Sequence, residues 1–138
     1  MPFMMWMVGA EIDRLDIASV TNEEIKMSEI KVEHVSAAQV FEDDTFSSRR
    51  LIRRDHGSEE MSFNVATLHE NYNDQNCVYP DYDEIVYVLS GKAELTIDGE
   101  TQTVSEGTAF YVPRGVPYGY KVVEAPNNVV AVFTPAKK

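Results

Sequence analysis

The fold of this chain is decided by one stretch, residues 82–115, which reads YDEIVYVLSGKAELTIDGETQTVSEGTAFYVPRG. Short apolar runs alternate here with turn signals: a glycine turn at Gly91, a tight-hairpin signal at Asp98-Gly99 and a further turn at Glu106-Gly107. A turn at Pro113-Arg114-Gly115 closes the stretch. The strands expected between these turns are residues 84–91, 92–97, 101–104 and 108–112. Evenly spaced short strands of this kind predict an all-β antiparallel barrel or jelly roll.

Two motifs in this stretch resemble those of the cupin superfamily. Glu84 and Gly91 stand at the spacing of the glutamate and the final glycine of its first motif. Gly107, Pro113 and Gly115 fit its second motif without a gap. The resemblance implies an RmlC-like fold, the cupin type 2 barrel, which is a single antiparallel jelly-roll β-barrel with a dimer as its usual state.

The metal-binding positions of these motifs carry mostly other residue types. The first-motif histidines fall on Cys77 and Tyr79, or on Val78 and Pro80 for the shorter spacing. The second-motif histidine falls on Tyr118, and only Glu84 keeps a usual metal ligand. The resemblance is therefore to an atypical cupin, whose frame is present and whose metal centre has largely gone.

A shorter likeness lies at the head of the first motif. Residues 82–85, which no histidine precedes closely, are similar to the cupin-type protein of ethanolamine-utilisation operons. That resemblance would imply a non-standard cupin with a proposed acetate-kinase activity. The activity is not carried over, because no glycine-rich phosphate loop of known type stands in the chain.

Length and composition limit the classes of protein to which the chain can belong. Its 138 residues suffice for one domain with its own core, and no apolar run reaches the length of a membrane span. The net charge of −11 argues against nucleic-acid and anionic membrane partners. The single cysteine cannot form an internal disulfide, and no basic residue precedes the apolar N-terminal residues. These features predict a cytoplasmic protein.

The first 26 residues differ from the rest. They are expected to be an extension from an upstream start or an interface arm, and residues 27–138 are expected to form the barrel domain. Trp6 and the methionines around it make an apolar patch, for which a partner subunit is a suitable cover. The expected partners are a small-molecule ligand and, as a homodimer, a second copy of the chain.

Four further segments have the alternation or the apolar run expected of strands: residues 30–35, 48–55, 62–70 and 129–134. The last of these is expected to be buried on both faces. Two segments are expected to be turns or polar loops: residues 71–81 and 125–128.

Three residues are expected to converge in the mouth of the barrel, because the resemblance places the metal positions inward: Glu84, Tyr79 and Tyr118, with Cys77 as a fourth. A carboxylate that faces an apolar barrel must be paired, or it stays protonated, and tyrosine hydroxyls are suitable donors to it. Glu84, Tyr79 and Tyr118 are thus the candidate catalytic residues of a cleft that moves a proton. The alternative is a satisfied polar plug in place of a lost metal site.

Four residues are candidates for ligand binding around this cleft: Tyr82, Cys77, His69 and Tyr120. Tyr120 shares a strand face with Tyr118 by the pleat, and His69 is the histidine nearest the motifs. No metal and no other cofactor is predicted, since no histidine pair has metal-ligand spacing. The alternative is one divalent metal ion held by His69 and Glu84.

A group of arginines stands out in so acidic a chain: Arg49, Arg50, Arg53 and Arg54. By strand alternation Arg49 and Arg53 share one face, and Arg50 and Arg54 share the other. Either face could bind an anionic substrate, and the alternative is that these residues pair with acidic side chains of a neighbouring strand or subunit.

Three functions are consistent with these observations. The first is a metal-independent small-molecule-binding protein or non-redox enzyme of the isomerase, cyclase or lyase type that uses Glu84, Tyr79 and Tyr118. The second is a degenerate metal enzyme such as a dioxygenase. The third is a non-catalytic ligand sensor or structural dimer. The missing histidines favour the first over the second, because imidazole is a preferred ligand of iron, nickel and zinc.

Overall fold

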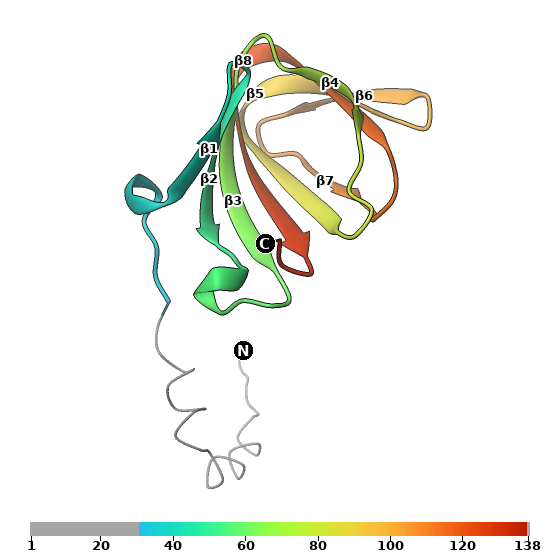
Figure 1. Ribbon diagram of the computed structural model, residues 1–138. Helices are drawn as coiled ribbons and strands as arrows, with labels where there is room; N and C mark the ends of the chain where they lie inside the picture. The colour runs from blue at the N-terminus through green and yellow to red at the C-terminus, as the bar shows by residue number, and fades with distance from the viewer. Residues whose placement is uncertain (1–30, 138) are drawn as a thin grey trace, which may run out of the picture. The chain divides into compact units, whose positions relative to one another are not determined.

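The computed structural model describes residues 31–137, and they form an antiparallel all-β fold (Figure 1). The elements in chain order are the 3-10 helix η2 (Val35–Ala37), β1 (Gln39–Glu42), β2 (Phe46–Ile52), the 3-10 helix η3 (Arg54–His56), β3 (Ser62–Leu68), β4 (Asn73–Cys77), β5 (Asp83–Ile97), β6 (Glu100–Ser105), β7 (Ala109–Val112) and β8 (Tyr118–Thr134). The all-β prediction is confirmed. The boundary expected after residue 26 lies outside the described residues, so it stays a prediction.

The two longest strands, β5 and β8, connect the two halves of the fold. Over residues 127–134, β8 pairs with β3 on one edge and with the first half of β5 on the other. Over residues 118–124 it pairs with β4 and with the second half of β5. One half-sheet therefore has the order β1-β2-β3-β8-β5-β7 and is called here the β1 half-sheet. The other, the β4 half-sheet, has the order β4-β8-β5-β6.

The hydrophobic core lies between the two half-sheets, as expected of a jelly roll. Alternate residues of β5 and β8 point inward and are buried, whereas Ile85, Tyr87 and Leu89 between them are exposed. The buried core cluster contains Leu68, Val86, Val88, Ala93, Leu95, Val104, Val112, Tyr118, Tyr120, Val122, Val129, Ala131 and Phe133. Figure 1 shows β1, β2 and β3 side by side, with β5 and β8 continuing from them toward β4 and β6.

The turns predicted at Gly91 and at residues 125–128 are wrong, because β5 and β8 each continue through them. Both strands bend here, and the register of their pairing shifts on either side of Gly91. Gly91 has a φ of 81°, and an added Cβ would lie 2.5 Å from the Pro126 carbonyl oxygen and 2.6 Å from that of Glu124. The glycine therefore allows the two bent strands to stay paired and does not reverse the chain.

Three other segments also differ from expectation. The polar segment 71–81, predicted to be a loop, contains β4, which is held in the sheet by backbone pairing with β8 and not by an apolar face. The described part of 30–35 is not a strand, and β1 begins at Gln39. The strand expected over 48–55 ends at Ile52, because η3 begins at Arg54 and the His56 amide donates to the Arg53 carbonyl at 3.0 Å.

The last strand is buried on one face only. In β8, Val129, Ala131 and Phe133 are buried, whereas the residues between them are half-buried. Both edges of this part of β8 are paired, and the half-buried residues Val130 and Val132 lie on its outer face. Within residues 31–137, the structure has no helix long and apolar enough to cross a membrane.

Candidate active site

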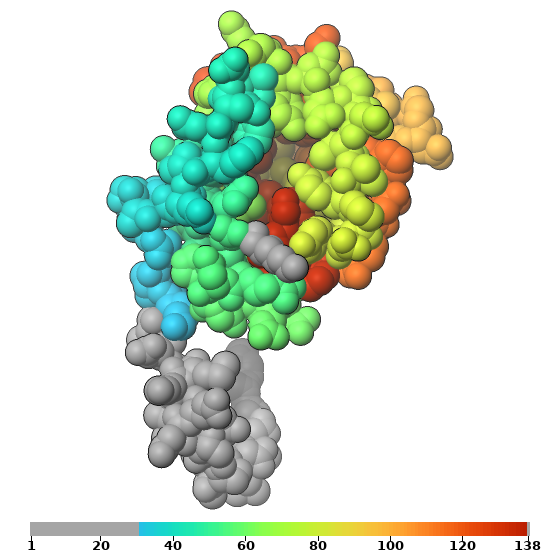
Figure 2. Space-filling view, viewed as in Figure 1, coloured from blue at the N-terminus to red at the C-terminus, as the bar shows by residue number. Residues whose placement is uncertain are grey.

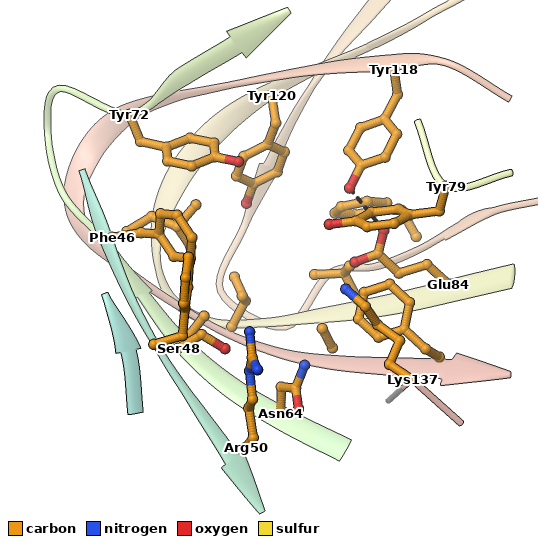
Figure 3. A pocket seen from close by; sticks show the side chains of 18 of the residues that line it. Phe46, Ser48, Arg50, Asn64, Tyr72, Tyr79, Glu84, Tyr118, Tyr120 and Lys137 are labelled. Carbon is orange, nitrogen blue, oxygen red and sulfur yellow. Dashed lines mark hydrogen bonds between the residues drawn. The ribbon is translucent and has the colours of Figure 1, made fainter. Parts of the chain in front are cut away.

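A cavity of about 260 Å³ lies between the two half-sheets. Residues of β2 and β3 form one wall, and residues of the first half of β5 and the later half of β8 form the next. Four tyrosines complete the lining: Tyr72, Tyr79, Tyr118 and Tyr120. In the space-filling view the surface is hollowed between the teal β1–β2 segment and the yellow-green segment that contains β4 (Figure 2). Figure 3 shows the side chains around this cavity. The cavity thus opens where the sequence placed the barrel mouth.

Glu84 is the only acidic residue among those that line the cavity. It is the second residue of β5 and pairs in register with Phe133 of β8 and Val112 of β7. Its side chain is 5% exposed, and its Oε1 accepts a hydrogen bond of 2.8 Å from the Tyr118 hydroxyl. That is the one hydrogen bond of this carboxyl group within residues 31–137, so Oε2 remains available to a ligand.

Burial raises the pKa of Glu84 from its ordinary value of 4.5 to about 7. The Tyr118 hydrogen bond and the positive charge of Lys137 act in the opposite direction and lower it. A carboxyl group with a pKa near 7 is present in both protonation states at neutral pH. Glu84 can therefore both accept and donate a proton there.

Tyr118 and Tyr79 flank this carboxyl group as protonated phenols. Burial raises the pKa of each hydroxyl well above its ordinary value, with further contributions from nearby Cys77 and Glu84. The Tyr79 ring packs edge-on against Phe133, with ring centroids 5.0 Å apart. Figure 3 shows both tyrosines with Glu84 at one end of the cavity, where the sequence predicted that they would converge.

Tyr120 also lines the cavity, but its hydroxyl already has a partner. It donates to Asn127 Oδ1 at 2.7 Å, and Asn127 Nδ2 donates to the Ser90 carbonyl at 2.9 Å. Burial raises the pKa of Tyr120 to about 12. This chain of hydrogen bonds connects the bend of β8 to that of β5, so Tyr120 offers the cavity chiefly its aromatic ring.

The structure does not bring the other three predicted ligand-binding residues into the cavity lining. Cys77 is half-buried next to Tyr118 and Tyr79, and burial raises the pKa of its thiol. Tyr82 packs behind Phe133, with ring centroids 6.2 Å apart. His69 is exposed at the end of β3, where its amide donates to the Thr45 carbonyl at 2.9 Å.

Five polar residues of the lining were missed or left undecided by sequence reasoning: Ser48, Arg50, Arg53, Asn64 and Lys137. Arg50 belongs to the arginine group that the sequence singled out, and a register shift after Arg50 in β2 explains how Arg53 also reaches the cavity. Lys137 follows β8, and no sequence motif or pattern around it indicates a binding role. Its position depends on how the end of the chain folds back, which no local pattern encodes.

Comparison with known proteins agrees with this arrangement of strands. Residues 79–133 match the family model described as Cupin domain. The fold is that of the cupins. A region of 53 residues is 38% identical to an uncharacterised protein of Streptomyces coelicolor, which covers 38% of this chain and 50% of that one. The chain spans about half the length of the curated relatives it matches.

Two solved structures have a fold similar to that of this chain. Ectoine synthase from P. lautus is 21% identical with a TM-score of 0.70, over 79% of this chain and 80% of that one. The polyketide cyclase RemF from Streptomyces resistomycificus is 21% identical with a TM-score of 0.66, over 78% and 80%. At these identities the likeness concerns the fold alone.

The residues at the metal positions of the cupin motifs do not fit a metal ion in this chain. Tyr79 and Tyr118 stand where imidazoles would bind, and burial keeps both phenols protonated. The Tyr118 hydroxyl also donates a hydrogen bond to Glu84. Among residues 31–137, no three His, Cys, Asp or Glu side chains gather closely enough to hold a metal. The donor set suits proton transfer better than metal binding.

Proposed function

We propose that this cupin-fold chain binds a small molecule in the cavity and transfers a proton through Glu84. The reaction would be a metal-independent, non-redox conversion of the isomerase, cyclase or lyase type. The observation that carries the proposal is the state of Glu84: it is buried, bonded to one phenol, and has a pKa of about 7. A general acid–base group is most effective when its pKa lies near the working pH.

Each residue of the cluster has a distinct task in this reaction. Glu84 takes a proton from a C–H or O–H bond of the ligand, and the electron pair of that bond stays on the ligand. The Tyr118 hydroxyl orients the carboxylate through Oε1 and leaves Oε2 for the proton. Tyr79, also protonated, can donate to a ligand oxygen on which negative charge develops. Glu84 then returns the proton to another atom of the ligand, so no oxidant or reductant is needed.

The names of two similar structures support this class of chemistry. One is an ectoine synthase and the other a polyketide cyclase. Because those likenesses concern the fold alone, they are consistent with this reaction class but determine neither the class nor the substrate. The likeness to the cupin of ethanolamine-utilisation operons stays a prediction from residues 82–85, and so does a cytoplasmic location, which rests on the single cysteine.

The proposal is tested by hydrogen–deuterium exchange at carbon. The full-length protein is incubated in D2O near pH 7 with a panel of small 2-oxo acids and 1,3-dicarbonyl compounds, and NMR follows the loss of each C–H signal. We expect exchange above the buffer rate for at least one compound, and its loss in Glu84→Gln. Glu94→Gln is the matched control, because Glu94 lies on the same strand with an exposed side chain. Equal exchange in all three proteins and in buffer would contradict the proposal.

A homodimer is also proposed, through the outer face of the β1 half-sheet. Residues adjacent in register form an apolar row across four strands: Phe63 in β3, Val132 in β8, Ile85 in β5 and Tyr111 in β7. Ile85 is 51% exposed and Tyr111 55% exposed in the single chain. A contiguous apolar surface of this kind favours contact with a second copy over contact with water.

A further inference from the structure

The charge of the cavity differs from the charge of the chain. The chain as a whole has a net charge of −11, yet three basic residues line the cavity against a single acid. The three are Arg50, Arg53 and Lys137. Burial lowers the pKa of Lys137, and repulsion from Arg50 and Arg53 lowers it further, whereas Glu84 raises it, so the three cations lie close together. A strongly acidic protein that gathers three cations around this cavity has concentrated positive potential where a ligand would bind.

Two of these cations, Arg50 and Lys137, are partly buried and form no ion pair among residues 31–137, although Glu84 is near enough to Lys137 to raise its pKa. Lys137 Nζ lies over the Phe133 ring at 4.3 Å from its centroid and over the Tyr79 ring at 4.5 Å. The Arg50 guanidinium lies over the Phe41 ring at 5.1 Å. Contacts with aromatic faces stabilise a cation only modestly, and a buried charge normally has an ionic or hydrogen-bonded partner. A bound anion would supply that partner.

Neutral donors are placed beside the cations. Asn64 of β3, which pairs in register with Arg50 of β2, is 8% exposed. Ser48, two residues before Arg50 on the same inward face, is 9% exposed. Neither side chain has a hydrogen-bond partner within the part of the chain that the structure describes, although buried polar groups in proteins are nearly always paired. Figure 3 shows both residues at the Arg50 and Lys137 end of the cavity, away from Tyr72 and Tyr120.

The backbone fixes Lys137 in this position. Its own amide donates to the Ser62 hydroxyl at 3.1 Å, and the preceding residue, Ala136, donates its amide to the Glu59 carbonyl at 3.1 Å. Arg54 Nη2 donates to the Ala136 carbonyl at 3.0 Å. These bonds tie the end of the chain to β3 and to the segment before it. Lys137 is therefore held at the cavity by the fold, as a binding group must be to act with low entropic cost.

We propose that the ligand of this cavity is a small carboxylate with a flat apolar body, whose carboxylate binds at Arg50, Lys137 and Asn64. The inference rests on the proposal that the cavity is the ligand site, and it adds the chemical class of the ligand. An arginine fork with an amide donor matches the two oxygens of a carboxylate. The apolar body would lie between the rings of Phe46, Tyr72 and Phe110, which line the remaining wall.

The size of the cavity agrees with a ligand of this class. An apolar protein cavity of about 150 Å³ admits benzene. The cavity of this protein, at about 260 Å³, has room for a body of that size and for a carboxylate beside it. Figure 3 shows Lys137 next to Glu84 and Tyr79, so a ligand whose carboxylate binds at Lys137 lies beside the Glu84 carboxyl group. The anion site would thereby present the ligand to the proton-transfer group.

The test compares benzoate with benzamide, which has the same shape and no charge, by isothermal titration of the full-length protein at pH 8. Benzoate is expected to bind at least tenfold more tightly than benzamide. Arg50→Gln and Lys137→Gln should each weaken benzoate binding tenfold or more and leave benzamide binding within threefold. Arg49→Gln is the matched control, because Arg49 does not line the cavity and its guanidinium contacts Ser47 at 3.3 Å. Thermal unfolding of each variant checks that it is folded.

Two results would overturn the inference: equal binding of benzoate and benzamide, or benzoate binding that survives both cavity variants unchanged. Phenyl phosphate serves as a third probe, and tighter binding of it than of benzoate would replace carboxylate by phosphate as the ligand class. Failure here is distinct from failure of the proposed function. Anion binding with no Glu84-dependent exchange would contradict proton transfer alone, whereas Glu84-dependent exchange that neither cavity variant alters would contradict the anion site alone.

Discussion

Glu84 owes its chemistry to opposing influences of its surroundings on the pKa of its carboxyl group. Burial raises the pKa of its carboxyl group, and the Tyr118 hydroxyl and Lys137 lower it, with a result of about 7. The sequence could identify Glu84 as a site residue, because it is the one motif position that keeps a usual metal ligand. The other metal positions of the motifs carry Cys77, Tyr79 and Tyr118. It could not fix the balance of influences, because Lys137 arrives from the far end of the chain.

The first prediction concerns the Tyr118 hydrogen bond. Tyr118→Phe removes the donor to Glu84 Oε1 and should raise the Glu84 pKa by about one to two pH units, since a hydrogen bond to a charged group contributes roughly 1.5–3 kcal/mol. Carbon-13 NMR of protein labelled at the glutamate carboxyl carbons measures it. Tyr120→Phe is the control, because its hydroxyl bonds Asn127. A fall in the Glu84 pKa, or an equal rise in both variants, would contradict the assignment.

The second prediction concerns stability against pH. A carboxyl group whose pKa is higher in the folded state favours folding below its unfolded pKa and loses that contribution as pH rises through the folded value. For Glu84 that window runs from 4.5 to about 7. Glu84→Gln cannot ionise, so relative to wild type it should gain up to about 3 kcal/mol in unfolding free energy between pH 5 and pH 8. Urea unfolding measures the difference, with Glu94→Gln as the control that should show no such trend. A difference in unfolding free energy between Glu84→Gln and wild type that is the same at every pH would refute this prediction.

At the scale of elements, the paired bend of β5 and β8 brings the two half-sheets over one cavity. The sequence predicted most strands of the central stretch, since alternation and glycine placement are local signals. It placed turns at Gly91 and at residues 125–128, because glycine, proline and asparagine are typical of turns. Whether such residues reverse the chain or bend a strand depends on the pairing partner, which is not a local property. β4 was missed for the same reason: its four polar residues and Cys77 become a strand only beside β8.

The third prediction tests the close approach at this bend. Gly91→Ala should destabilise the fold more than Gly99→Ala, although both glycines have a φ near 80°. At Gly99 nothing lies within 4 Å of an added Cβ, so the backbone strain alone is expected, roughly 1–3 kcal/mol. At Gly91 the carbonyls of Glu124 and Pro126 must also move. Urea denaturation of both variants gives the comparison, and equal losses would mean that the strands do not depend on this contact.

For the whole molecule, two features depend on tertiary structure that the sequence does not display. The first is the cationic end of the cavity, which joins Arg50 from β2 to Lys137 from the chain end. The arginine group was noticed in the sequence, but strand alternation assigned Arg50 and Arg53 to opposite faces, and the shift in register after Arg50 invalidates that assignment. The second is the apolar row on the outer face, which becomes continuous only when β3, β8, β5 and β7 pair.

The fourth prediction concerns this outer row. Ile85→Arg places a charge in the centre of the exposed row and should convert the proposed dimer to a monomer, because an unpaired charge in an apolar interface costs several kcal/mol. Light scattering coupled to size-exclusion chromatography measures the mass, against a 15.6 kDa chain. Glu94→Gln should leave the mass unchanged. A wild-type protein that elutes as a monomer, or an Ile85→Arg dimer, would show that this face is not the interface.

The account as a whole depends most directly on the protonation of Glu84. Carbon-13 NMR of the wild-type protein, labelled at the glutamate carboxyl carbons and titrated from pH 4 to pH 9, reports that protonation, and the Glu84→Gln spectrum identifies the signal. The account predicts a titration midpoint of about 7, well above the ordinary glutamate value of 4.5. A midpoint at or below 5 would contradict it, because Glu84 would then be a fixed negative charge at neutral pH and could not donate a proton there.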